Sequence, residues 1–272
     1  MEKIKQALER ARDTKRSTLR NSQKGVEIRQ APKPASDTKI TYSKTKSIKI
    51  SSEVLKEKRI ITGDENDSVS DQYKVLRTHV LQRLRSHKWN SLAITSPNEG
   101  CGKTLTAINL AISLAREVNH SVLLVDMDLR RPNIQKYFFS ENRPGIGEYL
   151  EEEMELSEIL FNPGLERLVI LPGNKSYANS SEILSSPRMV HLVKEITNRY
   201  PNRIVIFDMP PILMCDDMMA FSPYTDANML VVEEGVTQKS DLKRAYELLD
   251  KSNIIGTVLN KSKFKEGIYQ YY

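Results

Sequence analysis

A glycine-rich turn followed by Lys and Thr is the stretch of this sequence with the clearest chemical meaning. Gly100, Gly102, Lys103 and Thr104 come directly after a short apolar run, residues 92–96, and before a periodic apolar segment, residues 105–114. Glycines let backbone N–H groups approach a polyphosphate closely, and the N-terminus of a following helix adds partial positive charge. This order of elements predicts a phosphate-binding loop for a nucleoside triphosphate.

Within this loop, Lys103 is expected to contact the outer phosphates, and the Thr104 hydroxyl is expected to bind Mg²⁺. Pro97 stands where the common pattern has its first glycine, which leaves a compact GxGKT form. A glycine turn before an ordinary helix is the alternative interpretation. The residues predicted to bind ATP in this loop are Asn98, Glu99, Gly100, Cys101, Gly102, Lys103, Thr104 and Leu105.

Two further apolar runs end in aspartate. The run SVLLVD ends at Asp126 and is followed by Asp128, and the run RIVIFD ends at Asp208. The carboxyl ends of parallel strands face one crevice in an open α/β sheet, so these side chains are expected to meet the phosphate loop. Mg²⁺ prefers a few carboxylates together with phosphate oxygens. Thr104, Asp126 and Asp208 are therefore predicted to hold the metal, and the alternative is that they cap turns.

Asn260 follows the last predicted strand, where nucleotide-binding sheets often place residues that recognise the base. It is a candidate cofactor-binding residue, and a helix or turn cap is an equally good interpretation. The four histidines are scattered along the chain, so zinc chemistry or a histidine-activated nucleophile is not indicated. The two cysteines do not indicate a disulfide framework.

Short aliphatic runs alternate with amphipathic segments from residue 91 onward. Strands are expected at 91–96, 121–126, 166–171, 203–208, 227–233 and 254–259, with helices near 67–86, 103–117, 146–160, 181–199 and 238–250. Short aliphatic strands separated by helices predict an α/β fold with a doubly wound, mainly parallel sheet flanked by helices.

The basic charge of the protein is concentrated in its first 60 residues, which hold 17 Lys and Arg against 7 Asp and Glu, while the whole chain carries a formal net charge of +6. We expect a short helix near residues 1–15 and a flexible basic linker up to residue 60. A domain at 61–262 and a tail at 263–272 follow. No run approaches the roughly 18–20 apolar residues of a membrane helix, and no signal peptide is expected.

Taken together, these motifs resemble those of the bacterial tyrosine kinases (BY-kinases) of the CpsD/CapB type, within the MinD/ParA-like P-loop class. The resemblance covers residues 71–272 and includes VLLVDMDLRRP, VIFDMPP and NSSEILSSPRM. Asn98 stands where MinD and ParA proteins carry an extra lysine, which favours the kinases. Asp217 falls where these kinases have an Asp-Ala pair.

The resemblance implies an ATP- and Mg²⁺-dependent protein-tyrosine autokinase with Lys103, Asp126, Asp128 and Asp208 as catalytic residues. Asp126 would orient or deprotonate a tyrosine hydroxyl, with assistance from Asp128. The acceptors would be three tyrosines of a neighbouring subunit. These residues form the end of the chain and are Tyr269, Tyr271 and Tyr272.

The same resemblance implies a cytoplasmic protein held at the inner membrane by a polysaccharide co-polymerase, regulating exopolysaccharide biosynthesis or export. A cognate tyrosine phosphatase and self-association through the helix that carries Asp71, Lys74 and Arg77 are implied as well. The family reads Glu-x-x-Arg-x-x-Arg at this helix. Nucleic acid is not an expected partner. The alternatives are a MinD/ParA-like ATPase switch that positions a partner, and a non-catalytic protein with a degenerate site.

Overall fold

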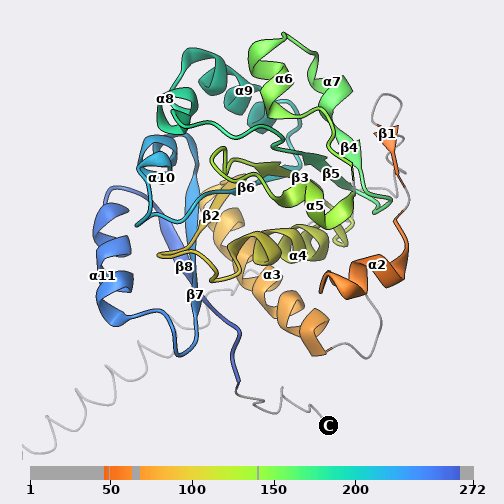
Figure 1. Cartoon of the computed structure of the whole chain (residues 1–272). Helices are drawn as coiled ribbons and strands as arrows, with labels where there is room; N and C mark the ends of the chain where they lie inside the picture. The colour runs from red at the N-terminus through yellow and green to blue at the C-terminus, as the bar shows by residue number, and fades with distance from the viewer. Residues whose placement is uncertain (1–45, 49, 63–67, 140, 264–272) are drawn as a thin grey trace, which may run out of the picture. The chain divides into compact units, whose positions relative to one another are not determined.

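The computed structural model describes residues 46–48, 50–62, 68–139 and 141–263. The helix expected near residues 1–15, most of the expected linker and the three tail tyrosines lie outside the described residues. Within the described residues, an eight-stranded sheet runs through the molecule with helices on both of its faces (Figure 1). The predicted α/β class and doubly wound, mainly parallel sheet are confirmed.

The strand order across the sheet is β1-β4-β5-β3-β6-β2-β7-β8, and the described neighbours pair in parallel except β4 with β5. The strands are β1 (Lys46–Ser47), β2 (Ser91–Thr95), β3 (Ser121–Asp126), β4 (Phe161–Asn162), β5 (Leu168–Leu171), β6 (Arg203–Asp208), β7 (Ala227–Glu233) and β8 (Ile254–Asn260). The chain leaves β2 toward β3 on one side and reaches β7 on the other, so a crevice opens at the carboxyl end of β2.

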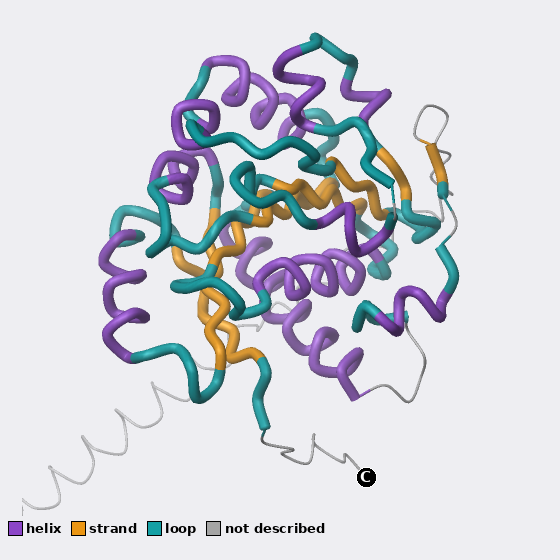
Figure 2. The backbone as a smooth tube through the Cα atoms, in the orientation of Figure 1, coloured by secondary structure: helices purple, strands orange, loops and turns teal. Residues whose placement is uncertain are grey.

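The helices connect these strands (Figure 2). They are α2 (Ser52–Glu57), α3 (Ser68–His87), α4 (Lys103–Ala115), α5 (Ile134–Phe138), α6 (Ile146–Glu151), α7 (Leu156–Ile159), α8 (Ser180–Leu184), α9 (Pro187–Asn198), α10 (Asp217–Phe221), the 3-10 helix η1 (Ser222–Tyr224) and α11 (Lys239–Leu248). None of the helices within the described ranges has the length and apolar character that crossing a bilayer requires.

Each face of the sheet buries its own apolar core, because neighbouring residues of a strand point to opposite faces. On β2, Leu92 and Ile94 join the core formed with α2, α3, α4 and α5, while Ala93 joins the core formed with α6 to α11. Strands buried on both faces must be mainly apolar, and this explains why the local runs predicted β2, β3, β6 and β7 so closely.

Two predicted helices are each divided in two. The segment expected at 146–160 forms α6 and α7, and the segment expected at 181–199 forms α8 and α9. Pro187 occupies the first turn of α9, and the Ser186 hydroxyl accepts a hydrogen bond from the Met189 N–H, so this position starts a helix and does not continue one. The two-residue strands β1 and β4 were not predicted, because such short pairings leave little periodic signal.

The end of the expected basic linker differs from the prediction. Residues 50–62 include helix α2, and Leu55, Ile60 and Ile61 are buried in the same core as α3 and α4. Charged residues flank these apolar residues in the sequence, so the apolar pattern is hard to recognise. Part of the segment predicted as a flexible linker, residues 50–60, therefore packs with the rest of the described chain, and the domain boundary at residue 60 stays a prediction.

Candidate functional site

The phosphate-binding loop predicted from the sequence connects β2 to α4. Gly100 and Gly102 have φ angles of 80° and 87°, which side-chain-bearing residues rarely adopt. A Cβ at Gly102 would lie 2.2 Å from Asn260 Nδ2, so a side chain at this position would displace the Asn260 amide. The Asn260 amide in turn donates a 2.9 Å hydrogen bond to the Cys101 carbonyl. Asn260, at the end of β8, therefore holds the loop in place.

Lys103 lies between two buried carboxylates. Its Nζ is 2.9 Å from Asp128 Oδ2 and 3.5 Å from Asp208 Oδ1. Burial alone would lower the pKa of Lys103, but the negative charges of Asp208 and Asp128 outweigh burial and raise that pKa above its ordinary value. The ammonium group is consequently held charged at the point where the carboxyl ends of β3 and β6 meet the start of α4.

Thr104 lies beside the same carboxylates. Its hydroxyl donates a 2.7 Å hydrogen bond to Asp208 Oδ2, and both side chains are buried. Burial raises the pKa of Asp208, and the neighbouring Lys103 charge and the Thr104 hydroxyl oppose this rise. The hydroxyl and the carboxylate are thus close enough to act on one bound ion.

Asp126 lies directly beside Asp208, because β3 and β6 pair in parallel with these two residues in register. Its Oδ2 accepts hydrogen bonds of 2.9 Å from the backbone N–H groups of Asn133 and Ile134. Its Oδ1 is buried and has no hydrogen-bond partner within the described residues. Burial and the charge of Asp208 raise the pKa of Asp126 far above its ordinary value, so one oxygen of this carboxyl is available to bind a proton or a cation.

These side chains fit a phosphate-bound Mg²⁺. The unpartnered Asp126 oxygen is a buried acceptor, and Thr104 and Asp208 present two more oxygens nearby. Within the described ranges no cluster of three or more His, Cys, Asp or Glu side chains forms a metal cage by itself. A metal ion here would need further ligands such as phosphate oxygens and water, which is how Mg²⁺ is usually held in nucleotide sites.

Three of the predicted loop residues direct their side chains to other partners. Asn98 donates a 2.7 Å hydrogen bond to Asp241 on α11. Glu99 forms a 2.7 Å ion pair with Arg131, and the buried Cys101 sulfur lies 3.8 Å from the Thr237 hydroxyl. If these residues bind phosphate, they therefore do so through their backbone N–H groups.

An ion pair between a partly exposed arginine and a buried aspartate joins the loop after β3 to the start of α10. Arg130 Nε lies 3.2 Å from Asp217 Oδ1, and Asp217 is completely buried with its second oxygen unpartnered within the described residues. The sequence contained both residues in recognisable motifs, but the partners are 87 positions apart. Nothing local in the sequence indicates that they meet.

The side chains on α3 that the resemblance assigned to self-association have partners within this chain. Lys74 forms an exposed 2.8 Å ion pair with Asp71. Arg77 donates a 3.1 Å hydrogen bond to the Ser113 carbonyl of α4 and lies 3.9 Å from Glu117. Self-association through this helix remains a prediction.

A glycine-rich loop after the first central strand, followed by Lys-Thr and faced by carboxylates from two neighbouring strands, defines a P-loop nucleotide-binding protein. A protein-family model described as an AAA domain matches residues 90–261. The tyrosine-protein kinase YwqD of Bacillus subtilis is 33% identical over 220 residues, which cover 79% of this chain and 92% of that relative. The chain belongs to the family of bacterial tyrosine-protein kinases.

Solved structures agree with this assignment. The kinase domain of the Escherichia coli tyrosine kinase ETK is similar with a TM-score of 0.68 and 25% identity, over 86% of this chain and 94% of that chain. The septum site-determining protein MinD of Pyrococcus horikoshii, solved with Mg-ADP, matches with a TM-score of 0.53 and 23% identity over 64% of this chain and 72% of that chain, which shows a shared fold.

Proposed function

We propose that this protein binds ATP with Mg²⁺ and transfers the terminal phosphoryl group to tyrosine. The observation that carries the proposal is the meeting of Lys103, Thr104, Asp128 and Asp208 at one point of the crevice. The family of the chain, whose relatives are named tyrosine-protein kinases, supports tyrosine as the acceptor.

Different residues would hold the phosphates and the metal ion of the nucleotide. Backbone N–H groups of residues 100–104 and the start of α4 would hold the phosphates, with Lys103 neutralising the outer ones. Thr104, Asp126 and Asp208 would hold Mg²⁺, which neutralises phosphate charge and helps to position the transferred group. Lys103 already lies against two carboxylates, so bound phosphate and Asp128 would compete for its ammonium group.

Asp126 is the best candidate for receiving the proton of the tyrosine hydroxyl. In the transfer, the phenolic oxygen bonds to the γ-phosphorus, the bond to the leaving oxygen of ADP breaks, and the proton passes to the carboxylate. An acceptor works best when its pKa lies near the working pH. Burial and the neighbouring Asp208 raise the pKa of Asp126 in that direction. Asp128 would assist by holding Lys103.

We propose the tyrosines of the tail, Tyr269, Tyr271 and Tyr272, as acceptors that reach the crevice of a neighbouring copy. Purified protein incubated with ATP and Mg²⁺ should gain phosphate on these three residues, as read by peptide mass spectrometry. A mixture of a Lys103→Ala chain with a chain whose three tail tyrosines are Phe should phosphorylate the former, because each supplies what the other lacks. Phosphotyrosine only at other positions would contradict this choice of acceptors.

We also propose, from the resemblance, that a membrane polysaccharide co-polymerase activates the protein at the cytoplasmic face of the inner membrane. Exopolysaccharide biosynthesis or export would be the regulated process, and a tyrosine phosphatase would reverse the modification. Phosphosite mapping of protein purified with and without the membrane partner tests this. Equal phosphorylation in both preparations would contradict activation by the partner.

A further inference from the structure

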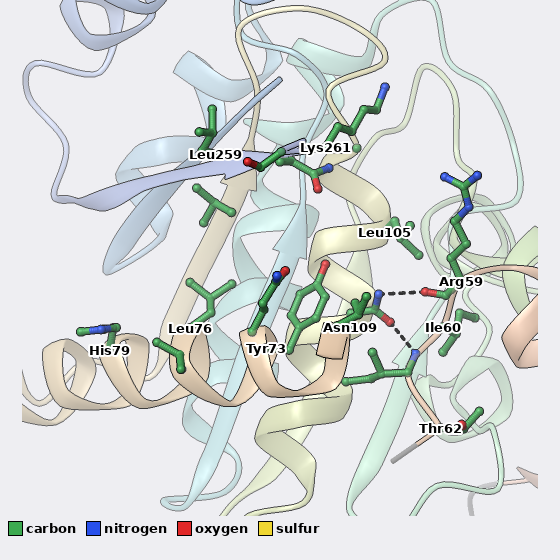
Figure 3. A pocket seen from close by; sticks show the side chains of 18 of the residues that line it. Arg59, Ile60, Thr62, Tyr73, Leu76, His79, Leu105, Asn109, Leu259 and Lys261 are labelled. Atoms are coloured by element: carbon green, nitrogen blue, oxygen red, sulfur yellow. Dashed lines mark hydrogen bonds between the residues drawn. The ribbon is translucent and has the colours of Figure 1, made fainter. Parts of the chain in front are cut away.

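A large pocket lies next to the phosphate-binding loop. Its volume is about 840 Å³. Gly102 and Leu105 line it from the loop and the first turn of α4, and Asn260 lines it from the end of β8. The opposite wall includes residues 59–62, which follow α2 and which we call the strap (Figure 3). The strap lies outside the segment that the family model matches, residues 90–261.

The strap is fixed to α4 by one buried side chain. The Asn109 amide oxygen accepts a 3.0 Å hydrogen bond from the Ile61 N–H, and its amide nitrogen donates a 3.1 Å hydrogen bond to the Arg59 carbonyl (Figure 3). Ile60 and Ile61 are buried in the core. Arg59 has a φ of 59°, a conformation that non-glycine residues rarely adopt and that these contacts maintain. The position of Arg59 is therefore determined by the fold.

The Arg59 side chain is exposed, although its backbone is held on both sides. Within the described residues its guanidinium group forms no hydrogen bond or ion pair. Two other basic side chains near the pocket do have partners. Lys58 donates a 2.6 Å hydrogen bond to the Lys136 carbonyl, and Lys261, on the opposite side of the pocket, pairs with Glu233 at 2.8 Å. Figure 3 shows the Arg59 side chain extending from the strap past Leu105.

We propose that Arg59 binds the base of the nucleotide, with its planar guanidinium group stacked on the face of the ring. This inference rests on the proposed ATP binding. A triphosphate held by residues 100–104 must place its nucleoside beyond the loop, and the pocket that begins at Gly102 and Leu105 offers the space. Arginine stacks on π systems because its charge is delocalised over a plane, which lysine lacks.

Nucleotide titrations of the full chain test this assignment. Arg59→Ala should raise the Kd for ATP and for ADP by about 5–10-fold, and by the same factor for both. It should leave the Kd for inorganic tripolyphosphate unchanged, because that probe has no base. Arg59→Lys should recover only part of the loss. Arg244→Ala, which removes another exposed arginine on α11, is the matched control and should change none of these constants.

Three results would overturn the assignment. Unchanged affinity of Arg59→Ala for ATP would show that the side chain makes no contact. An equal loss for tripolyphosphate would show that it acts on phosphate charge instead of the base. If the wild-type chain bound tripolyphosphate and ATP equally weakly, or not at all, the proposed function and this inference would fail together. Normal ATP binding by both wild type and Arg59→Ala removes the inference alone.

Asn109 is a positioning residue in this arrangement. Asn109→Ala should weaken ATP binding about as much as Arg59→Ala does, because it releases the strap. The double variant should then bind ATP no more weakly than Arg59→Ala, since both changes remove one contact. Hydrogen exchange at the Ile61 amide should be faster in Asn109→Ala than in wild type. Losses that multiply in the double variant would contradict the positioning role.

Discussion

The crevice at the phosphate-binding loop and the exposed face of α3 both carry charged residues, but the charges are buried in the crevice and exposed on α3. In the crevice, Lys103 at the start of α4 contacts both Asp128, which follows β3, and Asp208 at the end of β6, and all three side chains are almost fully enclosed. On α3, Lys74 and Asp71 are about half exposed and pair across one turn of the same helix. Burial makes the crevice charges depend on each other, whereas solvent screens the charges of α3.

The energetic consequences differ accordingly. Removing one partner from a buried ion pair leaves an uncompensated charge and costs about 3–5 kcal/mol, whereas an exposed pair contributes about 0–1 kcal/mol. The charged residues of the crevice therefore fix one another's positions, whereas the exposed charged residues of α3 could exchange partners at little cost.

Lys103→Ala should reduce ATP affinity at least about 100-fold, because it removes the cation that faces the phosphates and leaves Asp128 and Asp208 mutually repelling. Isothermal titration calorimetry of ATP with Mg²⁺ measures the change. Lys243→Ala on α11, whose side chain is exposed, is the control for loss of one positive charge. ATP affinity within a few-fold of wild type would discredit the loop assignment.

Arg130→Ala should lower the free energy of unfolding by about 2–3 kcal/mol, because the buried Asp217 carboxylate loses the ion pair described above. Urea denaturation measures this loss. The double variant Arg130→Ala with Asp217→Asn should recover part of it, since the unpaired charge is then absent. A double variant less stable than Arg130→Ala would show that Asp217 stabilises the fold by another contact.

Stability of the nucleotide-free protein should depend on pH through Asp126. Burial and the charge of Asp208 raise the pKa of Asp126 to about 8 in the folded state, above its ordinary value of 3.8. The folded state then holds a proton that the unfolded state has released, so this group's contribution falls as pH rises from about 4 to about 8. Asp126→Asn lacks this dependence.

In urea denaturation with EDTA, wild type should therefore lose on the order of 3–4 kcal/mol relative to Asp126→Asn between pH 5 and pH 8. The asparagine keeps a carbonyl oxygen for the N–H groups of Asn133 and Ile134, so the comparison isolates the charge. A stability gap that stays constant with pH would mean that Asp126 is ionised throughout this range.

Lys74→Ala should change the free energy of unfolding by less than about 0.5 kcal/mol, because its pair with Asp71 is exposed. If α3 is a self-association surface, the same variant should shift the protein to smaller species in sedimentation velocity. Thr78→Ala, one turn further along α3, gives a matched exposed change. An unchanged distribution for Lys74→Ala would count against a role for this side chain in assembly.

The sequence alone determined the features that depend on local pattern. The apolar runs predicted β3, β6 and β7 with their observed bounds, because a strand buried on both faces must be mainly apolar. The loop with Gly102, Lys103 and Thr104 and the strand-end aspartates were found for a similar reason: each lies next to a recognisable strand. Parallel pairing then brought Asp126 and Asp208 into register.

Only the tertiary structure decided which distant side chains meet. Arg130 and Asp217 are 87 residues apart, and Ile61 and Asn109 are 48 apart. Neither pair has a local signal, since a hydrogen bond between distant residues depends on how whole elements pack. The same reason explains why residues 50–60, with the first half of the strap, were predicted as linker: their apolar residues are few and lie among charges, and the burial of these residues depends on packing against α3 and α4.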